Sequence, residues 1–119
     1  TIANLTGLKE RHLHDHVQGV DLTPILRDPE TSVRDYCYIE EDEEVGPLTI
    51  RLRHLITREY KITTYESEEE FGDIYDRNED PEEIHNLWDD KDLRLKLLQK
   101  IHHATLKSLS KLPERQASS

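Results

Sequence analysis

The apolar residues of this chain change their spacing once, and that change constrains the fold more than any other feature. Between residues 34 and 76 they recur at every second position, as in half-buried strands. Between residues 90 and 112 they recur every three or four positions, as along one face of a helix. We therefore predict an α+β fold, a small antiparallel sheet of about four strands packed by a long C-terminal helix.

Four segments carry the two-residue period, and we expect strands at residues 34–39, 48–56, 60–65 and 72–76. The second segment has one apolar face, made of Leu48, Ile50, Leu52, His54 and Ile56. The final helix should be capped by Asp89 or Asp90 and end before Pro113. Its apolar stripe consists of Leu93, Leu97, Leu98, Ile101, Ala104, Leu109 and Leu112.

The segment before the sheet predicts a connection to a preceding domain. Ile2 and Leu5 have helical spacing and Gly7 suits a helix C-cap, so we expect a helix that begins upstream of residue 1. Asp21 should cap a short helix, which ends at Asp28-Pro29 and turns Leu22, Ile25 and Leu26 inward. We thus divide the chain into residues 1–33, which link to the preceding domain, an α+β subdomain at residues 34–112, and a disordered tail at residues 113–119.

Acidic residues dominate the charge. The chain has 26 Asp and Glu against 16 Lys and Arg, a formal net charge of −10 that disfavours nucleic acid and anionic membranes as partners. The acids are concentrated at residues 40–44, 66–70 and 79–83, which we interpret as solvated loops. A docking surface for a basic partner, or a weak calcium site, is the alternative interpretation.

Three groups of residues invite a chemical interpretation. His12, His14 and His16 alternate, so in an extended segment they could share a transition metal, although a polar loop rich in histidine explains them as well. The single cysteine, Cys37, lies on an expected strand followed by acids that would raise its pKa, which favours a structural thiol. Arg51 and Arg53 share a strand face and could hold an oxyanion, or else pair with the nearby acids.

Four stretches resemble, in order and spacing, the C-terminal part of sulfatases of the alkaline phosphatase superfamily. Residues 55–65 are similar to the family's R-T-x-x-Y-K-L hairpin, residues 1–7 to P-T-I-x-x-L-x-G, and residues 18–22 to x-Q-G-x-S-L. Residues 73–87 resemble E-L-Y-D-L-x-x-D-P-x-E-x-x-N-L and match it at Tyr75, Asp76, Asp80, Pro81, Glu83, Asn86 and Leu87.

Sulfatases hydrolyse sulfate esters with a formylglycine made from the cysteine of a C-x-P-S-R or C-x-A-x-R motif, and with a calcium ion. The residues after Cys37 depart from that motif, so the resemblance carries over no catalytic residue. It places formylglycine and calcium in the parent enzyme, upstream of this chain. It implies a C-terminal subdomain that packs on the catalytic domain. The 40–47 loop of this subdomain would line the rim of the pocket for a sulfate-ester substrate. The candidate residues for contact with the substrate are Arg51, Arg53, Glu41 and Asp42.

Two further expectations remain beside this one. The chain could be a free-standing acidic interaction module that binds a basic partner through residues 40–44 and 66–70. An exposed domain-facing patch could also make the chain self-associate. One cysteine allows no intrachain disulfide, so the sequence indicates no compartment.

Overall fold

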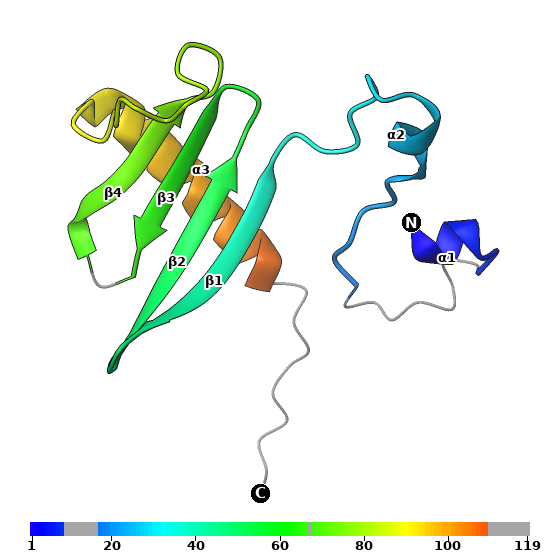
Figure 1. Ribbon diagram of the computed structural model, residues 1–119, viewed down its shortest axis with the longest axis horizontal. Coiled ribbons are helices and arrows are strands. Elements are labelled where there is room, and N and C mark those ends of the chain that lie inside the picture. The colour runs from blue at the N-terminus through cyan, green and yellow to red at the C-terminus, as the bar shows by residue number, and fades with distance from the viewer. Residues whose placement is uncertain (9–16, 67, 110–119) are drawn as a thin grey trace, which may run out of the picture. The chain divides into compact units, whose positions relative to one another are not determined.

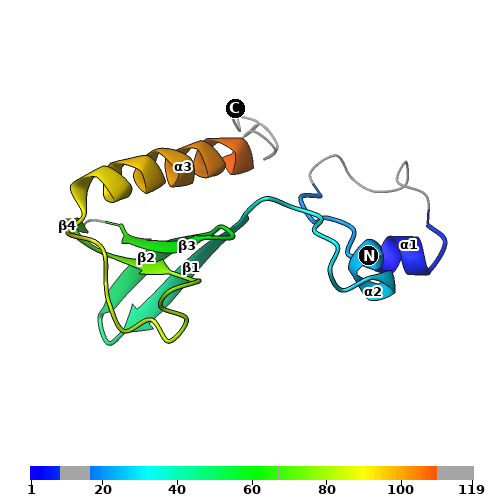
Figure 2. The same ribbon diagram turned by 90° about the horizontal axis from the view of Figure 1, so that it is seen from above.

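The computed structural model describes residues 1–8, 17–66 and 68–109. It forms two compact units, one of Thr1–Arg34 with Leu106–Ser119 and one of Asp35–Thr105. The second unit contains a four-stranded antiparallel sheet in the order β1-β2-β3-β4, with α3 across one face (Figures 1 and 2). The elements are β1 (Cys37–Val45), β2 (Leu48–Ile56), β3 (Tyr60–Tyr65), β4 (Glu68–Asp76) and α3 (Lys91–Leu109). The predicted α+β class is confirmed.

Two of the acidic runs are strands, where the sequence predicted loops. Residues 40–44 lie within β1, and residues 68–70 open β4. Both strands are edges of the sheet, where charged side chains stay solvated and discourage pairing with another chain. In β1 the acids also face bases, since Glu40 lies opposite Arg53 and Asp42 opposite Arg51. Cross-strand charge pairing of this kind favours the extended conformation.

The turn between β1 and β2 follows from its two central residues. Gly46 has φ +64°, a backbone conformation that residues with a Cβ rarely adopt. Pro47 follows it and fixes its own φ near −65°. A positive φ at the first central position and a negative φ at the second fit a type II′ turn, which matches the twist of a hairpin.

The core is a row of side chains that runs across the sheet beneath α3. Leu55, Ile62 and Ile74 are direct neighbours on β2, β3 and β4, and their exposed fractions are 1%, 0% and 0%. On α3, three buried members of the predicted stripe pack on this row, namely Leu97, Ile101 and Ala104. Burying a large apolar side chain contributes about 1.5–3 kcal/mol, so this row stabilises the unit substantially.

The apolar face of β2 is directed away from α3. Side chains alternate along a strand, so Leu55, under the helix, places Leu48, Ile50, Leu52, His54 and Ile56 on the other side. We call this side of the sheet, opposite α3, the open face. In the described part of the unit no helix lies over it (Figure 2). The loop after β4 reaches it at Glu83, which forms an ion pair with Lys61.

The loop between β4 and α3 is held along the edge of β4 by Asn86. The Asn86 Oδ1 atom accepts hydrogen bonds from the backbone N–H of Ile74 and of Trp88, both at 3.0 Å. Its Nδ2 atom donates to the Gly72 carbonyl oxygen and to Asp73 Oδ1. One side chain thus satisfies backbone groups of both the strand and the loop, which fixes the path of the chain into α3.

Two aspartates order the segments on either side of this asparagine. Asp80 accepts hydrogen bonds from the N–H groups of Ile84 and His85, and these bonds lower the pKa of its carboxyl group. Together with the hydrogen bond from the Glu83 N–H to the Asp80 carbonyl oxygen at 3.0 Å, they close a turn after Asp80. Asp90 caps α3, because its Oδ1 atom accepts a hydrogen bond from the Leu93 N–H at 3.1 Å.

The first unit contains two short helices, α1 (Ile2–Leu5) and α2 (Thr23–Arg27). Asp21 Oδ1 accepts hydrogen bonds from the backbone N–H and the hydroxyl of Thr23. The N-cap residue of α2 is Leu22, however, so the predicted cap at Asp21 is wrong by one residue. The expectation that Leu22 and Leu26 point inward is wrong, because 40% and 67% of their surfaces are exposed. Helices of four and five residues are too short to bury a whole apolar face against each other.

Candidate functional site

The β1–β2 hairpin extends beyond the rest of the sheet. The pairing of β2 with β3 begins at Leu52, whereas its pairing with β1 continues to the Val45–Leu48 pair at the turn. Residues 43–50 therefore form a two-stranded arm that projects from the sheet (Figure 1). The predicted rim residues lie at the base of this arm, on β1 and β2.

Arg51 is clamped between acids. Its Nε and Nη2 atoms donate to the two carboxylate oxygens of Asp42 at 2.7 and 3.2 Å, and Nη1 lies 3.4 Å from Glu66 Oε2. The hydrogen bond from Arg51 lowers the pKa of Asp42, and the same bond raises the pKa of Arg51. A guanidinium held in this way is already compensated, which is the salt-bridge alternative that the sequence left open.

Arg53 points to the same side of the sheet and approaches a second acid. Its Nε atom is buried, lies 3.8 Å from Glu40 Oε1 and has no hydrogen-bond partner among the described residues. The Glu40 carboxylate instead accepts a hydrogen bond from the Tyr38 hydroxyl at 2.7 Å, and Thr105 Oγ1 donates to that hydroxyl at 3.0 Å. Burial, and then the hydrogen bond to Glu40, raise the pKa of Tyr38.

Glu41 lies on the open face, away from the other three predicted rim residues. Its Oε2 atom is 3.5 Å from His54 Nε2, and His54 Nδ1 is 2.9 Å from Thr63 Oγ1. The structure thus brings Arg51, Asp42 and Arg53 to the α3 side and separates Glu41 from them. Alternation along β1 already required this separation of Glu41 from Asp42.

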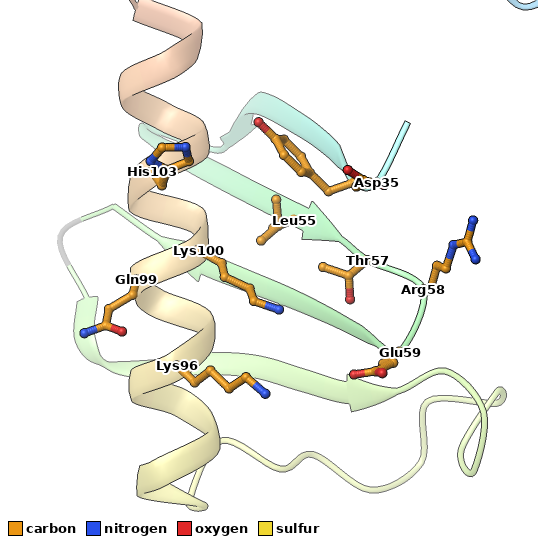
Figure 3. Close-up of a pocket in the computed structure, with 10 residues that line it drawn as sticks. Asp35, Leu55, Thr57, Arg58, Glu59, Lys96, Gln99, Lys100 and His103 are labelled. Atoms are coloured by element: carbon orange, nitrogen blue, oxygen red, sulfur yellow. The ribbon is translucent and has the colours of Figure 1, made fainter. Parts of the chain in front are cut away.

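A groove of about 590 Å³ lies between α3 and the turn that joins β2 to β3 (Figure 3). Leu55 and Tyr36 are among its lining residues. Lys96 and Lys100 extend across it from α3 (Figure 3). Thr57 and Glu59 form the opposite wall, and Asp35, Arg58, Gln99 and His103 complete the lining. The volume lies within the range of small-molecule sites.

Lys96 and Lys100 differ from the cations of the sheet. Arg51, Arg53 and Lys61 each have an acidic neighbour, whereas neither of these lysines forms an ion pair within the described ranges. They are four residues apart on one helix, so their stems lie about 6 Å apart on the same face. The sequence places them on the outer side of the helix. Their spacing was the available signal, but the fold was needed to show the groove beside them.

The remaining candidates do not form a site in the described chain. His12, His14 and His16 lie outside the described residues. Among the residues that are described, no three His, Cys, Asp or Glu side chains are grouped so as to hold a metal ion. Cys37 is half-buried and carries a free thiol at the start of β1. None of the described helices is both long enough and apolar enough to cross a membrane.

Comparison with known families agrees with this architecture. The four-stranded antiparallel sheet with one long C-terminal helix is the architecture that the resemblance to the C-terminal part of sulfatases predicted. The model of one such family, described as N-sulphoglucosamine sulphohydrolase, C-terminal, matches residues 1–112. The chain belongs to this family. Searches of curated proteins and of solved structures gave no significant match.

Proposed function

We propose that this chain is the non-catalytic C-terminal portion of a sulfatase that acts on a sulfated sugar, and that it packs on the catalytic domain through the open face. The observation that carries the proposal is the set of exposed apolar side chains on this face. Phe71 and Ile39 are 56% and 41% exposed, and Leu48 and Val45 continue the surface along the arm at 64% and 54%. An apolar surface of this kind marks an interaction site.

The catalytic chemistry belongs to the parent enzyme in this proposal. Cys37 does not fit the formylglycine position, because it is half-buried on β1 and is followed by Tyr38 and Ile39 instead of the required motif. Formylglycine and calcium therefore belong to the catalytic domain. The described residues supply packing and, through the arm, the rim of the substrate pocket.

In this proposal the arm and the ion pair at its base form the rim of the substrate pocket. Arg51 and Asp42 hold β1 and β2 together where the arm leaves the sheet. Two neighbouring carboxylates already neutralise the Arg51 guanidinium, so it would attract an anionic substrate only weakly. Arg51 therefore acts by positioning the arm. Within the described chain, Arg53 has only a long contact of 3.8 Å with Glu40 and a side chain that is 34% exposed, so it has more capacity to contact an anion.

The packing role is tested in the whole enzyme with a matched pair of substitutions. Phe71→Glu places a charge on the open face, and Leu95→Glu places one on the exposed side of α3, where Leu95 is 61% exposed. We expect Phe71→Glu to lower the melting temperature and the yield of active enzyme, while Leu95→Glu leaves both near wild type. The reverse ranking would show that the α3 side packs on the catalytic domain.

The rim role has a separate test. Arg51→Ala and Arg53→Ala should lower kcat/KM for sulfated sugars in the whole enzyme, and Arg51→Lys should recover little because lysine cannot form the bidentate pair with Asp42. Unchanged kcat/KM across several sulfate esters would remove the arm from the substrate pocket and leave the packing role standing.

The acidic interaction module is less well supported by the contacts. The run in β1 is partly neutralised, since Glu40 and Asp42 already lie beside Arg53 and Arg51. A basic partner would have to displace these contacts before it could use the acids. The observations therefore favour the packing role.

A further inference from the structure

We propose that the groove between α3 and the β2–β3 turn is an accessory binding site for a sulfated sugar residue, separate from the arm and from the open face. This inference rests on the proposed function, which supplies the class of substrate. The groove itself is described by contacts within the Asp35–Thr105 unit alone.

The two lysines of the groove carry charges that no acid pairs with in the described chain. The chain has ten more acids than bases, yet Lys96 and Lys100 have no ion-pair partner in the described part of the chain. Both ammonium groups extend over the groove (Figure 3). Two cations held close together, neither of them in an ion pair, attract a compact anion such as a sulfate group.

The groove also has apolar side chains in its lining. Tyr36 and Leu55 line the groove together with the two lysines, so its lining combines cations with an aromatic ring and an aliphatic side chain. A sugar ring has an apolar face that can pack on such side chains while its sulfate group reaches the lysines. The combination of an apolar lining with a few convergent charged groups is typical of a small-molecule site.

The opposite wall of the groove carries an acid, so substitutions on the two walls should change the affinity for an anion in opposite directions. Glu59 lines the groove across from the lysines, and Lys96 extends in its direction (Figure 3). This carboxylate opposes the binding of an anion, so its removal should strengthen binding, whereas removal of the lysines should weaken it. A substitution that merely loosened the fold would not produce opposite effects on the two walls.

The test measures binding of a fluorescent sulfated tetrasaccharide to the whole protein by anisotropy. We expect the double variant Lys96→Gln/Lys100→Gln to bind about tenfold more weakly, since each lysine contributes a solvent-exposed charge contact. Glu59→Gln should bind more tightly than wild type. Lys91→Gln, on the same helix but outside the groove, is the matched control and should leave the affinity unchanged.

Three results would overturn the proposal. One is equal affinity for the double variant and the Lys91→Gln control, and another is equal binding of the unsulfated tetrasaccharide. The third is displacement of the probe by a polyglutamate peptide at lower concentration than by the sulfated sugar, which would indicate an acidic protein partner. Hydrolysis of an aryl sulfate by the wild-type enzyme reports separately on the proposed function, because the affinity ranking of the variants does not depend on it.

Discussion

Gly72 lies directly beneath the indole ring of Trp88. A Cβ atom built on Gly72 would fall 2.3 Å from Cζ3 and 2.4 Å from Cη2 of that ring, closer than real atoms approach. The ring is also fixed from its other end, because Trp88 Nε1 donates a hydrogen bond to the Glu70 carbonyl oxygen at 2.9 Å. The glycine is therefore required for steric reasons, and the contact fixes the start of α3 against β4.

Gly72→Ala should destabilise the protein. The added methyl group must push out a ring that is only 7% exposed, and overpacking of this kind costs about 1–3 kcal/mol. Gly19→Ala is the control, because a Cβ atom there meets nothing within 4 Å. Urea unfolding followed by tryptophan fluorescence measures both. Equal midpoints for the two variants would show that the ring moves aside without cost.

Asn86→Asp should also lower the free energy of unfolding. The carboxylate keeps an acceptor for the N–H groups of Ile74 and Trp88 but cannot donate to the Gly72 carbonyl oxygen, and it would face the carboxylate of Asp73. Losing such donors costs about 1–3 kcal/mol at pH 7. Asn78→Asp, on an exposed turn, should be nearly neutral in the same thermal-unfolding assay. A difference that persists at pH 2 would exclude charge repulsion as its cause.

The alternation of apolar residues within each segment predicted much of the sheet correctly. It failed where a segment forms a strand because of its pairing with the neighbouring strand. Residues 60–65 alternate clearly and form β3 over the expected range. Residues 40–44 have no apolar alternation, and they become a strand because β2 supplies Arg51 and Arg53 opposite them. That information lies in the register of the hairpin, which the sequence of β1 alone does not contain.

The sequence likewise predicted only part of the candidate site, and the rest required the fold. The pairing of Arg51 with a neighbouring acid was one of the two alternatives that the sequence offered, and the bidentate contact with Asp42 follows it. The separation of Glu41 from Asp42 depends on strand alternation, which could be applied only once residues 40–44 were known to be extended. The groove beside Lys96 depends on the packing of α3 over β2, a relationship between segments far apart in the sequence.

Tyr65 should ionise at unusually high pH. Its hydroxyl donates a hydrogen bond to Asp73 Oδ2 at 2.7 Å, and this bond, with burial and the charge of Asp73, raises the pKa of Tyr65 to about 12. Because the pKa in the folded state exceeds the unfolded value near 10, the stabilising contribution is complete below pH 10 and is lost as the pH rises through about 12.

Ultraviolet titration measures this ionisation directly. Tyr65→Phe should remove one phenolate step near pH 12, and Asp73→Asn should move the step to lower pH because the neutral amide no longer disfavours the phenolate. An unchanged titration curve in Asp73→Asn would show that burial alone sets the pKa.

Ile62→Ala should be among the most destabilising core substitutions. Ile62 is fully buried at the centre of the row that joins Leu55 to Ile74, so both neighbours would border the cavity left by the lost atoms. Truncations of this kind cost about 2–5 kcal/mol. Leu95→Ala, at a position 61% exposed, should change the unfolding free energy by less than about 0.5 kcal/mol. Chemical denaturation compares the two, and a small loss for Ile62→Ala would mean that α3 can settle onto the sheet and close the cavity.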